Sequence, residues 1–204
     1  MGFTSLHSLL SRMWNPPTLS RVLLENTVYS ALRDHPAGKV LEVGAGTLYS
    51  RQKLMRCDCY VTLDLNMMTK PTIVGDVHQL PFADNTFDTI LILEVLEHCP
   101  EPVRVLNECK RILTDKGYLF LSTRFLYVQH GAPHDYFRFT EDSLKYLLKH
   151  WSSVNVTPLG NRWSTIFDLI SGQNRLLRWA FWPSGPWVGR STSSAGGFFV
   201  TAQK

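Results

Sequence analysis

Residues 40–50, VLEVGAGTLYS, run from an apolar segment into two closely spaced glycines, Gly44 and Gly46. A glycine turn at the carboxyl end of a buried parallel strand lets a ligand approach the backbone, and the helix that follows offers free N–H groups. A dinucleotide-binding turn has the pattern GxGxxG, but Tyr49 occupies the third glycine position here. The sequence also lacks the Lys-Ser/Thr pair of a P-loop. The stretch therefore predicts an α/β ligand site and disfavours ligands with bridging phosphates.

Seven apolar runs have the length and composition of β-strands. They are residues 39–43, 60–63, 72–74, 87–93, 118–122, 153–157 and 198–201. Residues 102–113 have apolar side chains at helical spacing, and 140–150 begin with Thr140, a residue type that favours helix N-caps. Because buried strands alternate with amphipathic helices, the sequence predicts a mostly parallel sheet with flanking helices. The last two runs predict a closing antiparallel pair.

Length and composition favour one soluble α/β domain. A chain of 204 residues is long enough for one full core. It is 44% hydrophobic and 19% charged, and it has no apolar run long enough for a membrane-spanning helix. Its four cysteines form no CxxC pair and the N-terminus lacks a signal-peptide cleavage pattern, which together favour a cytoplasmic protein. The net charge of +4 is mild and not concentrated in one block, so no nucleic-acid partner is expected.

Acidic residues follow the expected strands at positions that suit a nucleoside. Asp64 ends the second strand, 18 residues after Gly46, close to the spacing at which a carboxylate accepts hydrogen bonds from two ribose hydroxyls. Asp76 follows the third strand, where its carboxylate suits an adenine amine and the amide of Val77 suits the ring. Glu42 precedes the glycine turn, where a carboxylate suits a cationic amine or sulfonium. Asp64 and Asp76 also have a simpler interpretation, as caps of the turns that follow them.

These segments, taken in order, resemble the class I S-adenosylmethionine-dependent methyltransferases, in particular the small type 11 group that is similar to the ubiquinone and menaquinone biosynthesis enzymes. The resemblance extends over about residues 39–151. VLEVGAGT resembles the first family motif, and VTLDLN resembles the ribose-binding strand end. IVGDVHQLPFADNTFDTILILEVLEH resembles the adenine motif with its following strand, and LNECKRILTDKGYLFLS the next helix and strand. One departure is Leu48, where many members have a third glycine.

The resemblance implies a Rossmann-like fold, S-adenosyl-L-methionine as the cofactor, and a set of cofactor-binding residues along the strand ends. The residues implied to bind the methionine part are Glu42, Gly44, Gly46 and the backbone of Glu94. Asp64 and Leu65 are implied to bind the ribose and the adenine edge, and Asp76 and Val77 are implied to bind the adenine. Within the single domain we expect an N-terminal helical cap (1–38), a cofactor-binding core (39–159), an insertion (160–197) and a last strand (198–204).

Methyl transfer to a hydroxyl requires a positioned acceptor and a group that takes its proton. The loops after the fourth and fifth strands supply three candidate catalytic residues: His134, His98 and Asp135. His98 has an alternative structural role, and Asp135 either orients His134 or takes the proton itself. Tyr136 and Arg138 are candidate substrate-binding residues, although Arg138 has the alternative of pairing with Asp135. The segment HDYFRFT resembles that of family members associated with envelope-glycan and secondary-metabolite pathways.

Two further motifs have structural interpretations. His130 and His134 are four residues apart, a spacing at which a helix can hold a metal ion, but Pro133 between them favours a loop, so no metal is expected. Residues 15–17, Asn-Pro-Pro, resemble the start of the motif with which amino-methyltransferases hold a flipped base. Its fourth position is Thr18 rather than an aromatic residue, so we interpret it as a turn.

The insertion is rich in aromatic and basic residues. It contains Trp163, Trp179, Trp182 and Trp187, together with Arg162, Arg175, Arg178 and Arg190. Asp168 is its only acidic residue. The sequence predicts a long irregular segment with two alternative roles: a surface that contacts a membrane or covers a large apolar substrate, with Trp163 as a substrate candidate, or a lid whose aromatic side chains pack on the sheet edge.

The sequence thus predicts an S-adenosylmethionine-dependent methyltransferase that acts on a small-molecule, glycan or lipid-linked acceptor, with oxygen favoured as the acceptor atom. We expect it in the cytoplasm, with peripheral contact at the inner face of a membrane through residues 160–190 as a further possibility. Two alternatives stay open: a non-catalytic S-adenosylmethionine-binding protein, and a nicotinamide-dependent oxidoreductase.

Overall fold

The structure is a computed structural model that describes residues 17–35, 38–45, 57–131, 134–171, 174, 176–177 and 191–204. The predictions for Gly46, Tyr49 and the tryptophans after Trp163 lie outside these residues. The helices are α2 (Leu19–Asp34), α3 (Pro102–Ile112), α4 (Glu141–Leu147) and α5 (Arg162–Ser171), with 3-10 turns η2 (Met67–Thr69), η3 (Leu96–His98) and η5 (Thr192–Ser194). The strands are β1 (Lys39–Val43), β2 (Cys59–Asp64), β3 (Ile73–Val74), β4 (Phe87–Leu93), β5 (Leu113–Arg124), β6 (Ser153–Leu159) and β7 (Gly197–Gln203).

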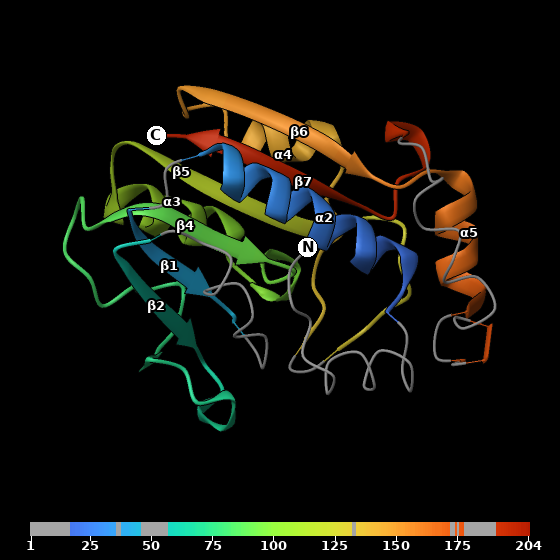
Figure 1. Cartoon of the computed structure of the whole chain (residues 1–204), viewed down its shortest axis with the longest axis horizontal. Coiled ribbons are helices and arrows are strands. Elements are labelled where there is room, and N and C mark those ends of the chain that lie inside the picture. The colour runs from blue at the N-terminus through green and yellow to red at the C-terminus, as the bar shows by residue number, and fades with distance from the viewer. Residues whose placement is uncertain are drawn as a thin grey trace.

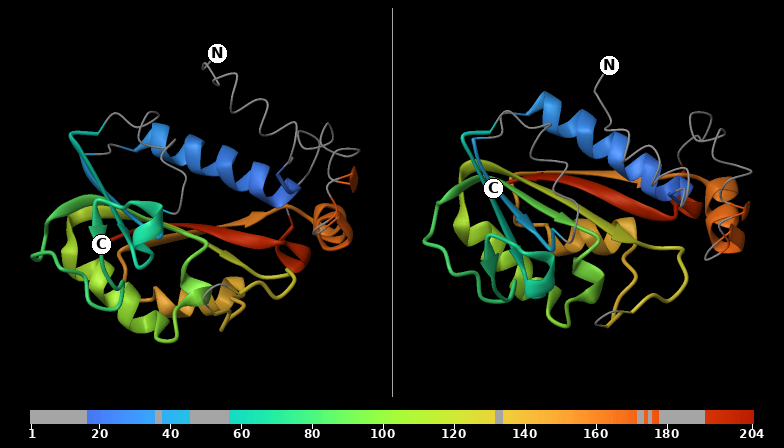
Figure 2. Two further views of the ribbon diagram at one scale, coloured as in Figure 1. Left: turned by 90° about the horizontal axis from the view of Figure 1, so that it is seen from below. Right: turned by 60° about the horizontal axis from the view of Figure 1, so that its bottom comes forward.

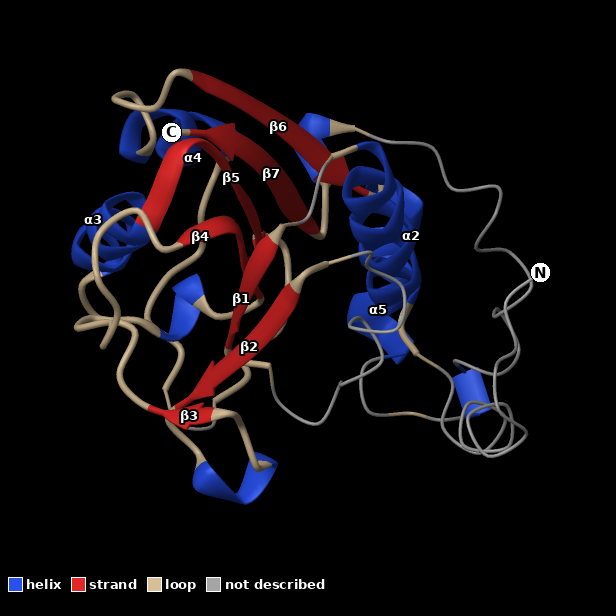
Figure 3. Cartoon of the chain, turned by 60° about the vertical axis from the view of Figure 1, so that its left-hand side comes forward, coloured by secondary structure: helices blue, strands red, loops and turns tan. Residues whose placement is uncertain are grey.

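The strands form one twisted sheet in the order β3-β2-β1-β4-β5-β7-β6 (Figures 1 and 3). Strands β1 to β5 are parallel to one another, and β7 is antiparallel to both β5 and β6. The predicted seven-stranded, mostly parallel α/β fold with a closing antiparallel pair is therefore confirmed. The strands predicted at 39–43 and 87–93 have the observed bounds of β1 and β4.

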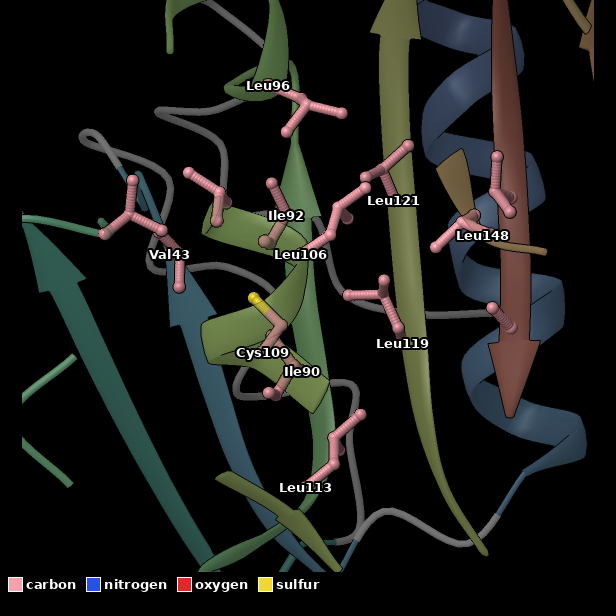
Figure 4. Packing of buried hydrophobic residues seen from close by; sticks show 14 of the residues in the cluster. Val43, Ile90, Ile92, Leu96, Leu106, Cys109, Leu113, Leu119, Leu121 and Leu148 are labelled. Carbon is pink, nitrogen blue, oxygen red and sulfur yellow. The ribbon is translucent and has the colours of Figure 1, made fainter. Parts of the chain in front are cut away.

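Both faces of the sheet are buried because successive side chains point to opposite faces. In β1, Leu41 and Val43 belong to the larger core cluster, whereas Val40 belongs to the smaller one. The larger cluster lies under α3 and α4 and includes Leu106 and Cys109 (Figure 4). The smaller cluster lies under α2, which crosses the opposite face (Figure 2).

Helices α3 and α4 form where the sequence predicts them. Thr140 is the N-cap of α4, and its hydroxyl accepts a hydrogen bond from the Ser143 amide at 3.1 Å. Ser143 returns the contact by accepting from the Thr140 amide at 2.8 Å, which completes a capping box. No helix in the described ranges is both long and apolar enough to span a membrane.

The prediction of an irregular insertion is wrong over Arg162–Ser171, which form α5 beside the first turn of α2 (Figure 1). The helix was not predicted because its buried face is polar: Ser164, Thr165, Asp168 and Ser171 are buried. The Asp168 carboxylate accepts hydrogen bonds from the amides of Leu19 and Ser20, each at 2.9 Å. Asp168 therefore caps the N-terminus of a helix that lies almost 150 residues earlier in the sequence.

Candidate cofactor and acceptor site

The carboxyl ends of three central strands meet at one edge of the sheet. Val43 of β1 pairs with Leu63 of β2 on one side and with Ile92 of β4 on the other. The sheet order reverses at β1 and β4, and the crevice at such a point is where open α/β sheets bind ligands. This edge therefore holds the residues that follow the strands, including the predicted cofactor-binding set.

Gly44 makes the turn at the end of β1 in a conformation that favours glycine. Its φ is +65°, in the left-handed region, and its amide donates to the Leu63 carbonyl at 2.8 Å. A β-carbon on Gly44 would lie 2.3 Å from Cγ2 of Val95. The turn thus brings bare backbone against the loop after β4, which fits a cofactor that must approach the main chain.

Glu42 lies two residues before this turn and is almost fully buried, with 1% of its surface exposed. The hydroxyl of Tyr60, on the neighbouring strand, donates to Glu42 Oε2. The carboxylate is therefore anchored at the base of the glycine turn, where the sequence predicts a contact with the cationic end of the cofactor.

The acids after β2 and β3 cap their own turns. Asp64 Oδ1 accepts from the Asn66 amide at 2.9 Å, and Asp76 Oδ1 accepts from the His78 amide at 2.9 Å and contacts its ring nitrogen at 2.6 Å. The His78 amide is the main reason why the pKa of Asp76 is lowered. Because 58% of the Asp76 side chain is exposed, capping leaves this carboxylate accessible to a ligand. For Asp76, the role of turn cap and the role of cofactor ligand are therefore compatible.

The two apolar residues of the predicted set differ in exposure. Leu65 is mostly exposed beside the end of β2, whereas the side chain of Val77 is buried in the larger core cluster. Leu65 is therefore accessible to an adenine edge, and Val77 offers its backbone.

Glu94 follows β4 in a strained conformation, with φ at +61°, which is uncommon for a residue that is not glycine. The Ser122 hydroxyl donates to Glu94 Oε1 at 2.9 Å, and Arg124 forms an ion pair with Oε2. Arg124 in turn donates to the hydroxyl of Ser20 on α2 at 2.8 Å and lies over the Tyr127 ring, 4.4 Å from its centroid. The predicted cofactor residue Glu94 is thus held by a buried arginine that the sequence did not single out.

Glu97 is the most buried acidic residue at this edge, with no exposed surface. The Thr123 hydroxyl donates to its Oε2 at 3.0 Å. Burial, and secondarily the nearby Glu94 carboxylate, raises the pKa of Glu97 to about 7. Glu97 belongs to the segment EVLEH that resembles the family pattern, but the residue itself was not predicted.

Around Glu97 the structure brings together His98 and His130 rather than His98 and His134. The rings of His98 and His130 lie edge to face, 5.0 Å between centroids. Nδ1 of His98 donates to the backbone carbonyl of His134, whose own ring is exposed. His134 is therefore placed as a backbone anchor, and His130 is the loop histidine inside the cluster. Burial lowers the pKa of His130.

Asp135 is committed to other contacts. It forms an ion pair with Arg138, which holds the pKa of its carboxyl well below the usual range, and it accepts from the His130 amide at 2.9 Å. The alternative in which Arg138 pairs with Asp135 is thus the observed one, and a carboxylate held this way is a weak base. The structure therefore assigns the pair to ordering the loop.

The remaining substrate candidates lie on different elements. Tyr136 donates its amide to the Glu97 carbonyl at 2.9 Å, and its ring is half exposed beside the cluster. Trp163 lies on α5 with 76% of its surface exposed. Its exposure disagrees with the alternative in which this ring packs on the sheet edge.

The sheet order, the glycine turn after β1 and the acids after β2 and β3 together define the class I methyltransferase fold, and their geometry fits S-adenosylmethionine. Residues 41–121 match the family model described as "Methyltransferase domain". The family match supports S-adenosylmethionine as the cofactor and argues against the nicotinamide alternative.

Curated relatives and solved structures agree with this class. The chain is 37% identical to the demethylmenaquinone methyltransferase of Thermotoga maritima over 79 residues, which are 39% of this chain and 31% of that protein. It is 30% identical to the ubiquinone biosynthesis O-methyltransferase of Actinobacillus pleuropneumoniae over 106 residues, 42% and 45% of the two chains. The chain thus spans less than half the length of these relatives.

A solved structure from Thermotoga maritima, described as a possible histamine N-methyltransferase, has the same fold with a TM-score of 0.63 and 16% identity. The alignment covers 91% of each chain.

Proposed function

We propose that the protein transfers a methyl group from S-adenosylmethionine to an oxygen of a small-molecule, glycan or lipid-linked acceptor. The observation that carries the proposal is one edge of the sheet, where the glycine turn at Gly44 and the exposed carboxylate of Asp76 lie at strand ends beside the Glu97, His98 and His130 cluster. S-adenosylmethionine, when bound, supplies an electrophilic methyl group. The chain supplies the geometry in which an acceptor oxygen meets it.

Each part of the edge has a task in this proposal. The turn at Gly44 and the backbone at Glu94 bind the methionine part, and Asp64 and Asp76 bind the ribose and the adenine. The acceptor hydroxyl lies against the cluster of Glu97, His98 and His130, because these groups follow β4 and β5 directly. Of the predicted catalytic residues, His98 keeps a place beside the acceptor.

Replacing Asp64 tests the cofactor assignment. We expect Asp64→Ala and Asp64→Asn each to weaken binding of S-adenosylhomocysteine by about 10- to 150-fold, since a hydrogen bond to a charged group contributes roughly 1.5 to 3 kcal/mol. Isothermal titration calorimetry measures this, with NADH as the control ligand.

The asparagine variant separates the two roles of Asp64. Its side-chain oxygen still caps the Asn66 amide, so a residue that acts only as a turn cap would lose affinity in the alanine variant alone. Unchanged affinity in both variants would refute the ribose assignment. Tight binding of S-adenosylhomocysteine, combined with no methyl transfer to any tested acceptor, would identify the non-catalytic alternative.

We also propose that α5 contacts an anionic membrane surface, which suits a lipid-linked acceptor. The usual amphipathic pattern is reversed in α5. Its polar face is buried against α2, and its exposed face carries Trp163, Ile166, Leu169 and Ile170. Residues 160–190 contain four arginines and a single acid, Asp168, which is buried as the cap of α2; of the arginines, Arg162 is exposed next to Trp163. An exposed apolar stripe with basic neighbours fits an interface between water and anionic lipid.

Vesicle binding tests the membrane proposal. We expect the protein to sediment with phosphatidylglycerol-containing vesicles but not with pure phosphatidylcholine, and to be released by high salt. Ile170→Ser should weaken this binding roughly tenfold or more, since burying such a side chain contributes about 1.5 to 3 kcal/mol. The matched control is Val103→Ser, an exposed apolar residue of α3, which covers the face of the sheet opposite α2. Equal sedimentation of the Ile170 variant and the wild type would exclude α5 as the contact.

A further inference from the structure

The geometry points to a binding site for a divalent transition-metal ion, formed by Glu97, His98 and His130. One ligand atom from each residue lies within 4.8 Å of the other two. The residues come from η3 and from the loop after β5, so His130 lies 32 positions after His98 in the sequence. Two histidines with one carboxylate are a donor set that zinc and related ions prefer.

The cluster contains polar atoms that its neighbours leave unsatisfied. Within the described part of the chain, Glu97 Oε1 and His130 Nδ1 are buried and have no hydrogen-bond partner. Glu97 itself has no exposed surface, and its other oxygen is bound by Thr123. A buried carboxylate oxygen without a partner is costly, and so is a buried ring nitrogen whose contact with Asp135 Oδ2 is 3.5 Å long; one cation would satisfy both.

The hydrogen bond of His98 prepares that ring for coordination. Its Nδ1 donates to the His134 carbonyl, and a carbonyl can only accept, so Nδ1 carries the proton and Nε2 presents its lone pair. A metal-binding histidine typically makes this kind of outer contact, which fixes its tautomer and orientation. Asp135 plays a similar supporting part for His130, whose amide it binds.

The local charge favours a cation. Glu94, Glu97 and Asp135 supply three carboxylates, while Arg124 and Arg138 supply two guanidinium groups, which pair with Glu94 and Asp135. With Glu97 ionised, the remaining charge is therefore negative and belongs to the buried carboxylate. A divalent ion would supply a countercharge in direct contact with this carboxylate.

Zinc ligands lie about 2.0 to 2.2 Å from the metal, so tetrahedral ligand atoms lie roughly 3.3 to 3.5 Å apart. Side-chain rotations that shorten the 4.8 Å separation by an ångström or so would complete the site. Three protein ligands leave a coordination position for water or for a hydroxyl oxygen of the acceptor. This last role rests on the proposed function: the ion would hold the acceptor oxygen and lower the pKa of its hydroxyl, with the proton released to water.

Direct metal binding tests the inference without a known acceptor. The whole chain, purified without a histidine tag and dialysed against a chelator, is titrated with Zn²⁺ by calorimetry and with Co²⁺ by visible absorption. We expect one equivalent to bind. Glu97→Gln and His130→Ala should each weaken binding by roughly 100-fold or more, since loss of an outer contact alone typically costs 10- to 100-fold. His150→Ala, at an exposed histidine, is the matched control and should bind like the wild type.

Two results would overturn the inference. One is a wild-type protein that binds no metal; the other is a metal affinity that both cluster variants retain, which would mean an adventitious ion only. A thermal shift with S-adenosylhomocysteine on the same samples checks folding and tests the cofactor site separately. Metal binding without the nucleoside shift would refute the proposed function but not the metal site, and the reverse result would refute the metal site alone.

Discussion

Replacing Arg124 with methionine is expected to lower the free energy of unfolding by about 3 to 5 kcal/mol, the largest effect we predict for a single side chain. The change leaves the Glu94 carboxylate buried next to β4 without its ionic partner. It also removes the hydrogen bond to Ser20, which connects the strand ends to α2. Urea unfolding monitored by circular dichroism measures the loss, and in thermal unfolding the same loss should lower Tm by roughly 10 °C in a chain of this size.

The double variant Arg124→Met/Glu94→Gln shows where the cost comes from. It leaves neither position of the pair with an unpaired charge, so it should be more stable than Arg124→Met alone. Together with the single variant Glu94→Gln it completes the double-mutant cycle that gives the coupling energy of the pair. Arg104→Met is the matched surface control, because its pair with Glu101 is exposed and should contribute between 0 and 1 kcal/mol. An Arg124 variant that unfolds like the Arg104 variant would show that the buried ion pair is not formed in solution.

The second large effect is expected for Asp168→Ala, at about 3 kcal/mol. The carboxylate accepts from two amides in the first turn of α2, and hydrogen bonds to charged groups contribute roughly 1.5 to 3 kcal/mol each. Removing it leaves both amides buried without an acceptor. Hydrogen exchange should therefore accelerate at Leu19 and Ser20 before it changes elsewhere in α2.

The control for this prediction is Asp115→Ala, whose side chain is 93% exposed and whose contact with Lys204 is 3.9 Å long. We expect its stability to stay within about 0.5 kcal/mol of the wild type. If Asp168→Ala behaved like this control, the cap between α5 and α2 would not contribute to stability, and the placement of α5 would need another cause.

The fold was predictable because its signals are local. Buried parallel strands form short apolar runs, and β1 and β4 are bounded by turn residues that fix both ends. Thr140 similarly marks the start of α4 by its own capping chemistry. The acids after β2 and β3 were found for the same reason, since the strand ends define where they lie.

The rest of the site depends on partners that are distant in sequence. Arg124 reaches Ser20 across 104 positions, and Asp168 reaches Leu19 across 149, so no spacing rule connects them. His134 was predicted as a catalytic residue with Asp135 next to it, but the loop turns so that the backbone carbonyl of His134 meets His98. Helix α5 was missed because the usual pattern of an apolar inner face is reversed in it. In each case the deciding interaction is tertiary.

The position of β7 between β5 and β6 limits how this protein can be divided into fragments. The segment that matches the family model ends at residue 121, yet β5 pairs with β7 along Tyr118–Arg124, and β7 is nearly the last segment of the chain. A fragment that stops at residue 121 would expose the long edge of an apolar central strand, which is a template for aggregation. The segment that matches the family model is therefore not an autonomous folding unit, and chimeras that exchange acceptor specificity should keep each chain's own final strand.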